Sequence, residues 1–424
     1  MINLLNKKSM TLFVSCSFIV QISFAQYNWV NYDTSNSGMA INSVIALTND
    51  KTGNVWASLS IGTSSPYGVI KFDGAIWTSY DSSNSGLPSN LIYGLNVDTL
   101  NNLWFGTDAG LVKFDGSNWT VYDVSNSGII NNHVWYVAID DLNRVWVDAS
   151  PWGLSIFNGS SWVSHTQSDW PIPNNSIEAM AFDDSNKVWF GCFGGGIAVL
   201  NLTDSSWVYY NTGNSNLPNN YISSIAKDNF GNMWAGFVLS SRVAKFNGSN
   251  WTVYSPFQNS GTWVAYNSMV FDNDNNLWIG TRSEGLYKYD GINWAQYGTP
   301  LPNSGISALN QSVNVDVNNK LWYGEVYTGL WTADLTIGID ENDFSYDGIS
   351  IYPNPVSDNL TVEIYAALQG KKDLSIYNTL GQEVLKKSFA ERKCLVDVAS
   401  LRSGIYFVSL KTEKNIVTAK IIKQ

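Results

Sequence analysis

The chain has 424 residues, with 35 Asp and Glu against 24 Lys and Arg and a formal net charge of −11. This excess of negative charge argues against binding of nucleic acid or of an anionic membrane face, because both depend on a basic surface. The length is sufficient for two or three domains.

Residues 1–25 are predicted to form a secretory signal peptide. Two lysines precede a mostly apolar stretch, residues 10–24, and a small-x-small pattern predicts cleavage between Ala25 and Gln26. The apolar stretch is short for a membrane span, and no other run reaches the roughly 18 residues that a span needs. We therefore expect no membrane span in the mature chain.

A repeated pair of residues dominates the sequence that follows. Seven times an Asp stands six residues before a Trp, and a second series of seven Trp runs in phase with the first. A period of roughly 40–50 residues with strand-like segments is typical of a propeller or a solenoid. The pairs are Asp50/Trp56, Asp98/Trp104, Asp140/Trp146, Asp183/Trp189, Asp228/Trp234, Asp272/Trp278 and Asp316/Trp322, and the second series is Trp29, Trp77, Trp119, Trp162, Trp207, Trp251 and Trp294.

One unit, residues 89–123, shows what is repeated. It contains four short apolar runs separated by polar turn residues, and Asp115-Gly116 between the last two runs is a hairpin signal. Four short antiparallel strands in about 44 residues correspond to one propeller blade. The predicted strands are residues 91–97, 103–106, 110–114 and 118–122.

The count of strands predicts how the ring closes. The mature chain opens with a single strand, residues 27–32, whereas the seventh unit ends near Thr332 without a fourth strand. The opening strand fits that vacancy, and such a closure removes the exposed edges of the sheet. We therefore predict an all-β protein with a seven-bladed β-propeller over residues 26–333.

The repeated residues are interpreted as architecture. We expect both Trp series to lie between adjacent blades, where burial of each large aromatic side chain contributes about 2–3 kcal/mol. The repeated Asp stands where the hairpin between the first and second strands begins. Its carboxylate is expected to accept backbone N–H bonds in that turn.

The sequence offers no pattern for a metal, a cofactor or a disulfide framework. His133 and His165 do not lie in a metal-ligand spacing, and residues 272–276 lack the Gly and Glu of a calcium loop. Cys192 and Cys394, the two cysteines after the signal, fall in different predicted domains and are expected to be buried apolar side chains. We predict no metal site and no cofactor.

A candidate binding site emerges when the repeat is subtracted. Trp152, Trp170 and Trp263 lie in loops that open on one face of the ring, and Trp135 lies close to that face. Aromatic platforms with a few polar groups, such as Arg282 and Glu284 here, suit sugar rings. The alternative is that these tryptophans fill gaps between blades. Trp331, which also lies outside both series, is expected in the core.

Three carboxylates suggest a different class of function. Glu178 stands in a first strand where the other six units carry no carboxylate, and either Glu325 or Asp148 could pair with it. Paired carboxylates are the groups that glycosidases use. The leading hypothesis is a non-enzymatic module that binds a glycan or a protein, and the alternatives are a polysaccharide lyase or glycoside hydrolase and an adhesion scaffold.

The units resemble the two-component regulator propeller repeat. The resemblance covers residues 27–333 and is carried by Val44-x-x-Leu47-x-x-Asp50 followed by Asn54-Val55-Trp56, and by Asn276-Leu277-Trp278-Ile279-Gly280-Thr281. It implies a seven-bladed propeller of a kind often found in sensors that detect glycans. Trp146-Val147-Asp148 departs from the pattern because it lacks the Gly. No kinase segment follows, so the signalling role is not expected here.

The tail is similar to a different family. Ile351-Tyr352-Pro353-Asn354-Pro355, Gly381-Gln382-Glu383-Val384 and Gly404-Ile405-Tyr406-Phe407-Val408 resemble the C-terminal sorting domain of the type IX (Por) secretion system of Bacteroidota. The alternating apolar pattern of residues 350–424 predicts a small Ig-like β-sandwich. The resemblance implies handling by the type IX machinery and a secreted or cell-surface protein, and residues 334–349 are predicted to be a linker.

Overall fold

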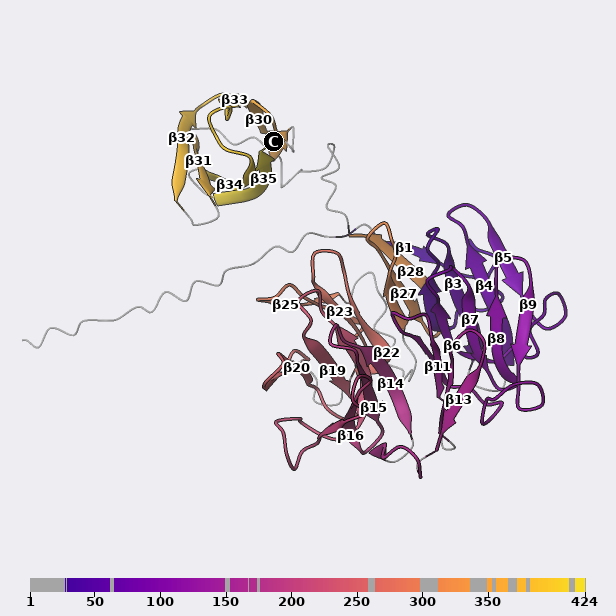
Figure 1. The fold of residues 1–424 in the computed structure, drawn as a ribbon. Helices are drawn as coiled ribbons and strands as arrows, with labels where there is room; N and C mark the ends of the chain where they lie inside the picture. Colours follow the sequence, from indigo (N-terminus) through magenta and orange to yellow (C-terminus); the bar gives the residue numbers. More distant parts are fainter. Residues whose placement is uncertain are drawn as a thin grey trace, which may run out of the picture. The chain divides into compact units, whose positions relative to one another are not determined.

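The structure is a computed structural model that describes residues 27, 29–61, 65–148, 153–166, 168–173, 176–257, 264–297, 312–335, 349–352, 356–364, 372–378, 382–411 and 416–423. The chain divides into two compact units between Leu335 and Thr336. Every named element in the described part of the chain is a β-strand (Figure 1), which confirms the predicted all-β class.

The described residues of the first unit form seven four-stranded antiparallel sheets, which we call blades 1 to 7 in chain order. Blade 1 contains β2 (Val44–Asn49), β3 (Val55–Ile61), β4 (Ser65–Phe72) and β5 (Trp77–Tyr80); blade 2 contains β6 (Ile92–Val97), β7 (Leu103–Thr107), β8 (Gly110–Phe114) and β9 (Trp119–Tyr122); blade 3 contains β10 (Tyr136–Ile139), β11 (Val145–Asp148), β12 (Leu154–Phe157) and β13 (Trp162–His165); and blade 4 contains β14 (Ile177–Phe182), β15 (Lys187–Cys192), β16 (Gly196–Asn201) and β17 (Trp207–Tyr210).

The remaining blades repeat the pattern. Blade 5 contains β18 (Ile222–Lys227), β19 (Met233–Phe237), β20 (Val243–Phe246) and β21 (Trp251–Tyr254); blade 6 contains β22 (Val264–Phe271), β23 (Leu277–Thr281), β24 (Leu286–Tyr289) and β25 (Trp294–Tyr297); and blade 7 contains β26 (Ser312–Val315), β27 (Lys320–Glu325), β28 (Gly329–Asp334) and β1 (Trp29–Tyr32).

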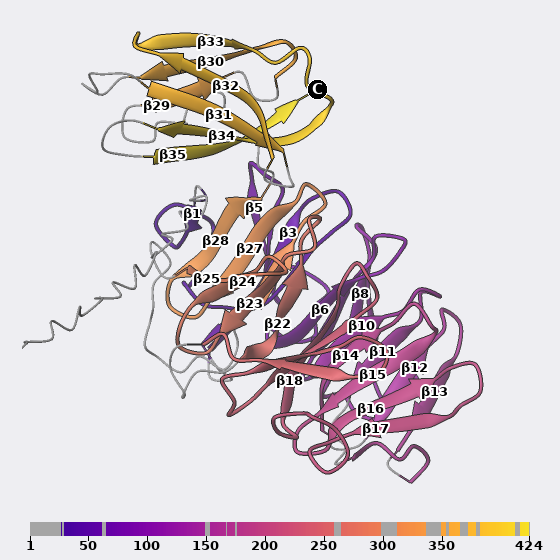
Figure 2. The same ribbon diagram turned by 90° about the vertical axis from the view of Figure 1, so that its left-hand side faces the viewer.

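The first strands of the blades surround the axis of the unit. Contacts join β2, β6, β10, β14, β18, β22 and β26 in succession, and β26 contacts β2 again, so the blades form a closed ring. Figure 2 shows five of these first strands, β6, β10, β14, β18 and β22, in the middle of the unit. This arrangement is a β-propeller. Because the first and second strands of each blade are antiparallel, the start of every first strand and the end of every second strand lie at the same end of the axis.

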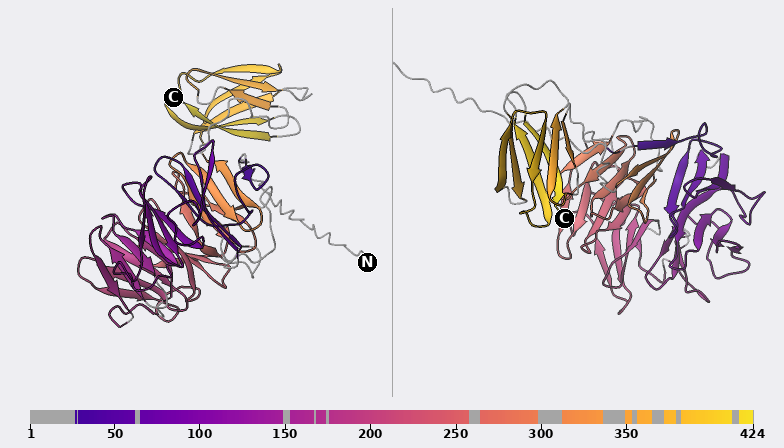
Figure 3. Two further views of the ribbon diagram at one scale, coloured as in Figure 1. Left: turned by 90° about the vertical axis from the view of Figure 1, so that its right-hand side faces the viewer. Right: turned by 90° about the horizontal axis from the view of Figure 1, so that it is seen from above.

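The two ends of the propeller sequence meet in blade 7, as the sequence predicts. β1 pairs antiparallel with β28, and Figure 3 shows this indigo strand beside the orange strands of blade 7. Trp29 lies opposite Ala333 and Tyr32 lies opposite Leu330. Asn31 Nδ2 also donates to the carbonyl of Thr328 at 2.9 Å. The pairing supplies the fourth strand that this blade would otherwise lack, and it holds the ring closed.

The repeated Asp has two roles in each blade. In blade 6, Asp272 Oδ1 accepts the backbone N–H groups of Asp274 at 3.1 Å and Asn276 at 2.8 Å, which confirms the predicted turn role. Its other oxygen accepts the indole N–H of Trp278 at 2.8 Å. The same indole bond is present in all seven units at 2.8–3.1 Å. A buried indole N–H therefore has its partner in every blade.

The tryptophans pack between blades, as predicted. Trp56 of blade 1 is only 2% exposed and contacts Phe114 of blade 2, with ring centroids 5.8 Å apart. Trp119 of the second series stacks on the same Phe114 at 4.3 Å and contacts Tyr80 of blade 1 at 5.6 Å. Each junction is thus filled by aromatic and aliphatic side chains from two blades, which couples the blades to one another.

The second unit contains two sheets that share one core. Its three-stranded sheet has the order β29 (Ile349–Tyr352), β30 (Asn359–Ile364) and β33 (Lys393–Asp397), and its four-stranded sheet has the order β32 (Glu383–Phe389), β31 (Lys372–Asn378), β34 (Gly404–Lys411) and β35 (Ile416–Lys423). Side chains from both sheets, including Leu360, Val362, Ile376 and Leu410, form a single buried cluster. The unit is therefore a small β-sandwich.

Candidate functional site

A cavity of about 850 Å³ lies on the axis of the propeller. Its walls come from the first strands of six blades, or the residues just before them, and from one residue at the end of β11. Its volume falls within the range of about 300–1,000 Å³ that is usual for small-ligand sites. The cavity is therefore the place where the unrepeated residues of several blades can meet.

Bulges decide which side chains reach the mouth of this cavity. The ladders between the first and second strands shift register around Ile45, Tyr93 and Glu178, so each of these is an extra residue in its strand. Blade 3 has a similar irregularity just before β10. Tyr136 is the residue paired with Asp148, but the backbone N–H of Trp135 also donates to the carbonyl of Asp148, at 3.3 Å, so Trp135 is the extra residue here. Ile45, Tyr93, Trp135 and Glu178 all line the cavity. A bulge re-aims a side chain, and here four successive blades aim theirs at one space.

Three rings from blades 2 and 3 form an aromatic cluster, and two of them, those of Tyr93 and Trp135, line the cavity. The ring centroids of Tyr93 and Trp135 are 4.3 Å apart, those of His133 and Trp135 are 4.5 Å apart, and those of Tyr93 and His133 are 4.9 Å apart. Trp135 is nevertheless 44% exposed. An indole that is held by two neighbouring rings and still open to solvent is a preformed platform for a ligand.

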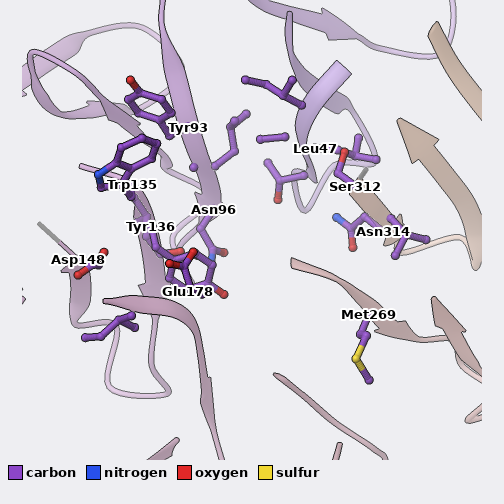
Figure 4. Close-up of a pocket in the computed structure, with 18 of the residues that line it drawn as sticks. Leu47, Tyr93, Asn96, Trp135, Tyr136, Asp148, Glu178, Met269, Ser312 and Asn314 are labelled. Atoms are coloured by element: carbon purple, nitrogen blue, oxygen red, sulfur yellow. The ribbon is translucent and has the colours of Figure 1, made fainter. Parts of the chain in front are cut away.

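Two carboxylates lie beside the platform. Asp148 and Glu178 both line the cavity, and Figure 4 shows them below Tyr93 and Trp135 on the same wall. Ser176 Oγ donates to Glu178 Oε1 at 2.8 Å. Burial raises the pKa of Glu178, and this hydrogen bond only partly opposes the shift. The carboxylate is thus held in place in surroundings that disfavour its charge.

The thiol of Cys192 lies near both carboxylates. Burial, which is the largest cause, and the negative charges of Asp148 and Glu178 together raise the pKa of Cys192 to about 12. Cys192 is fully buried, which confirms its predicted role as an apolar side chain. Of the two sequence-predicted partners for Glu178, Asp148 is therefore the one that lies in the same cavity.

Asp148 occupies a position where five other blades have glycine. Those glycines are Gly106, Gly191, Gly236, Gly280 and Gly324, and blade 1 has Ser58. A Cβ added to Gly236 would meet Val264 Cγ1 at 2.7 Å, so the glycine allows the next first strand to approach closely. The missing glycine noted in the sequence is thus the origin of a carboxylate in the cavity wall.

Glu325 lies outside the lining of this cavity. It is only 1% exposed, and it accepts a hydrogen bond from Thr328 Oγ1, which in turn accepts the indole N–H of Trp331 at 3.1 Å. Burial and the charge of Glu325 both raise the pKa of Tyr323. Glu325 therefore belongs to a hydrogen-bonded group within blade 7.

Arg282 and Glu284 lie in the turn between β23 and β24 and are also outside the lining of the cavity. Tyr287 OH donates to Glu284 Oε2 at 2.5 Å, and Gln296 Nε2 donates to the Glu284 carbonyl at 2.9 Å. Glu284 is only 6% exposed. Its contacts hold the turn of blade 6, and the structure does not bring it to the Trp135 platform.

The loop tryptophans have different outcomes. Trp170 stacks on His165 at 3.9 Å and contacts Trp207 at 5.5 Å and Phe190 at 6.3 Å, and it packs, partly buried, against the core between blades 3 and 4. For Trp170, this placement agrees with the alternative that the loop tryptophans fill gaps between blades. Trp152 and Trp263, and the predicted cleavage site at Ala25 and Gln26, lie outside the described residues.

Three members of the site escaped the sequence analysis. Tyr93 and His133 were not proposed as ligand-binding residues, although Tyr93 stands at the same strand position as Glu178 and Trp135. Asp108 follows β7, and its charge raises the pKa of Tyr93 together with burial, whereas at His133 burial lowers the pKa and Asp108 opposes it. A search for unrepeated residues at the start of the first strands would have found Tyr93 and His133.

Two further observations concern the described part of the chain. Within it, no group of three or more His, Cys, Asp and Glu side chains is arranged to hold a metal ion. The same residues include no helix with the length and apolar character of a membrane span.

Comparison with known families supports both resemblances. Residues 350–424 match the secretion system C-terminal sorting domain, and residues 216–237 and 260–283 match the two component regulator propeller. No curated protein matches the sequence. The chain thus joins propeller repeats to a tail of the type IX class, which directs proteins to the cell surface or the medium.

Solved structures share the fold at low identity. PorZ of Porphyromonas gingivalis, an essential surface component of the type-IX secretion system, is 19% identical with a TM-score of 0.58 over 93% of this chain and 61% of that chain. The extracellular domain of BT3049 from B. thetaiotaomicron is 19% identical with a TM-score of 0.61 over 94% and 60%. Virginiamycin B lyase from Staphylococcus aureus is 10% identical with a TM-score of 0.59 over 73% and 100%.

These similarities concern architecture. The chain spans about three fifths of the length of PorZ and of the BT3049 domain, at 61% and 60%. At such identities the shared feature is the fold, and a fold hosts many unrelated functions.

Proposed function

We propose that this exported β-propeller is a non-enzymatic module that binds a carbohydrate at the mouth of its central cavity. The observation that carries the proposal is the cluster of Tyr93, His133 and Trp135 beside Asp148 and Glu178. The C–H face of a sugar ring stacks on an indole, while its hydroxyl groups bond to carboxylates and to other polar side chains of the cavity wall, such as Asn96.

The preformed platform favours binding because little ordering is needed. Tyr93 and His133 already fix one side of Trp135, so the indole loses little rotational freedom when a ligand arrives. The raised pKa of Glu178 and the buried position of Asp148 show that the carboxylates are already partly shielded from water. Hydrogen bonds from sugar hydroxyls to such groups are stronger than in bulk water.

A glycan array tests the proposal. The full chain is compared with Trp135→Ile, because Ile45 stands at the same position in blade 1 and shows that the bulge tolerates an aliphatic side chain. Phe230→Ala is the matched control, since it removes a 78% exposed aromatic side chain from the hairpin between β18 and β19, at the opposite end of the blade. We expect the first variant to lose signal and the control to retain it.

Equal glycan binding by the wild type and Trp135→Ile would reject this site. A different outcome is that no glycan gives a signal while proteins are cross-linked to the chain at the cell surface. That outcome would favour a protein ligand or a scaffold role over a carbohydrate ligand. Trp152 and Trp263 stay predicted additional contacts, and their alanine variants belong in the same array.

A second candidate function rests on the two carboxylates. Asp148 and Glu178 line one cavity, and the raised pKa of Glu178 is the property of a general acid. This arrangement favours a polysaccharide lyase or glycoside hydrolase as the enzymatic alternative. Incubation with a polysaccharide panel decides: products that vanish with Glu178→Gln would establish an enzyme, and the absence of products would leave the binding module.

A further inference from the structure

The charges around the platform are of one sign. Asp148 and Glu178 line the cavity, and the charge of Asp108 acts on both Tyr93 and His133. The described lining residues include no lysine and no arginine. Burial lowers the pKa of His133, so the one basic ring in the cluster is held in its neutral form. A ligand that enters this mouth therefore meets carboxylates and aromatic faces.

The protein shows elsewhere what kind of group fits such surroundings. In blade 5 the Lys245 ammonium lies 5.2 Å from the centre of the Trp234 ring and 3.4 Å from Asp228 Oδ2. In blade 7 Lys320 lies 4.8 Å from the centre of the Trp322 ring. In blade 5 an indole and a carboxylate together hold an ammonium group, through cation–π attraction and charge pairing.

We propose that the cavity mouth selects a glycan that carries a protonated amine. Its ammonium group would be held by the indole of Trp135 and the carboxylates of Asp148 and Glu178, as Lys245 is held by Trp234 and Asp228 in blade 5. The inference rests on the proposed carbohydrate site and names its ligand class. The sugar ring lies on the indole and the ammonium faces the carboxylates. The same field disfavours glycans that carry carboxylate or sulfate groups, because like charges repel in a partly buried site.

The burial of Glu178 supports the choice of a cation. Its surroundings disfavour the ionised form, and an ammonium group placed beside it compensates for the water that it has lost. A neutral sugar hydroxyl offers a hydrogen bond but no charge. An amine therefore gains more from this site than its N-acetylated counterpart does, although both have the same ring to stack on Trp135.

The test compares three oligosaccharides of equal length by calorimetry on the full chain: chitosan, which carries free amines, N-acetylated chitin, and oligogalacturonate. We expect chitosan to bind about tenfold or more tightly than chitin, and oligogalacturonate to bind most weakly. Asp148→Gly combined with Glu178→Ser should abolish the preference. Both substitutions copy residues of other blades, Gly106 and Ser223, so the strand geometry is retained.

A matched control separates the site from the acidity of the whole chain. Asp73→Asn combined with Asp115→Asn also removes two carboxylates, from the hairpins between the third and fourth strands of blades 1 and 2. Asn158 and Asn247 stand at these positions in blades 3 and 5 and accept the same turn hydrogen bonds. We expect this control to keep the full preference for chitosan.

The outcomes distinguish the two levels of the proposal. Equal or tighter binding of chitin or oligogalacturonate, with a loss of binding in Trp135→Ile, would overturn the amine preference and leave the carbohydrate site. A preference for chitosan that the control pair also abolishes would overturn it as well, because the attraction would then be general. Binding that Trp135→Ile does not weaken would overturn the carbohydrate site itself.

Discussion

The indole N–H of Trp278 donates to Asp272 Oδ2 at 2.8 Å, and the two residues are six positions apart on either side of the first hairpin of blade 6. Neither the carboxylate nor the indole is more than 2% exposed. The bond ties the turn, which Asp272 organises through its other oxygen, to the aromatic layer between blades. Its repetition in all seven units makes it the link between local turn structure and the packing of the ring.

Asp272→Ala is expected to destabilise the propeller by about 2–4 kcal/mol, because it leaves the buried indole and two turn N–H groups without their acceptor. Asp272→Asn should cost less, since its amide oxygen can still accept. Urea unfolding followed by Trp fluorescence measures this in the full chain, because all 19 tryptophans lie in the first unit. Equal stability of the wild type and the alanine variant would contradict the role of the bond.

Acid is expected to lower the stability of the propeller through the repeated Asp residues. Burial acts to raise the pKa of Asp50, Asp98 and Asp228, but their hydrogen bonds outweigh it and the pKa is lowered in each case. A carboxyl group with a lowered folded-state pKa contributes stability that is present above the unfolded pKa of about 3.9 and is lost as the pH falls below it. We expect the urea midpoint to fall steeply below about pH 4; a midpoint that rises there would contradict the assignment.

Glu178 should behave in the opposite way. Burial raises its folded-state pKa, so the folded protein holds its proton more tightly and loses stability as the pH rises through that pKa. Glu178→Gln is therefore expected to raise the free energy of unfolding at pH 7 and to change it less at pH 4. Urea titrations at the two pH values measure the difference. A variant that is less stable at pH 7 would show that the carboxylate has a structural partner.

Trp135 and Trp170 should separate binding from stability. Trp170→Ala removes a partly buried ring that packs against the core between blades 3 and 4, and we expect it to cost about 3 kcal/mol. Trp135→Ala removes a 44% exposed ring and should cost about 1 kcal/mol or less, while glycan binding falls about tenfold or more. Urea unfolding and calorimetry on the two variants test this; a binding loss confined to Trp170→Ala would reverse the assignment.

Deletion of residues 27–32 should open the ring. The deletion removes β1 from blade 7, and with it the contacts of Trp29 with Tyr27 and Tyr297. We expect a loss of about 3–5 kcal/mol or more, because partly buried aromatic side chains are lost and a sheet edge is exposed. The urea midpoint and the oligomeric state by light scattering provide the readouts. Unchanged stability and a monomeric variant would show that closure depends on other contacts.

The propeller was predictable because its residues repeat. One Asp–Trp pair carries little information, but seven pairs in phase fix the strands, the turns and the inter-blade layer. The unpaired fourth strand at residues 27–32 likewise predicts its own partner, because only the seventh unit lacks one. The acceptor role of Asp272 toward turn N–H groups followed from its position, whereas its bond to Trp278 did not, since it depends on how the strands pair.

The site was less predictable because its residues do not repeat. Trp135 and Glu178 were found as departures from the repeat, and Tyr93 and His133 could have been found in the same way. The influence of Asp108 on Tyr93 and His133 depends on how the neighbouring blades are placed around the axis. Glu325 and Asp148 looked equivalent as partners for Glu178, and only the structure puts Asp148 in the cavity wall. The sequence position of Trp170 in a loop could not show that its ring packs against the core between blades 3 and 4.

The amino-acid sequence by itself determined the all-β class, the repeating blade, the strand that closes the ring and the sorting tail, because each follows from local pattern and period. Tertiary structure alone decided which unrepeated side chains share a cavity. Bulges and blade packing set the direction of each side chain at the axis, and these depend on contacts between residues about 40 or more positions apart, which no local pattern encodes.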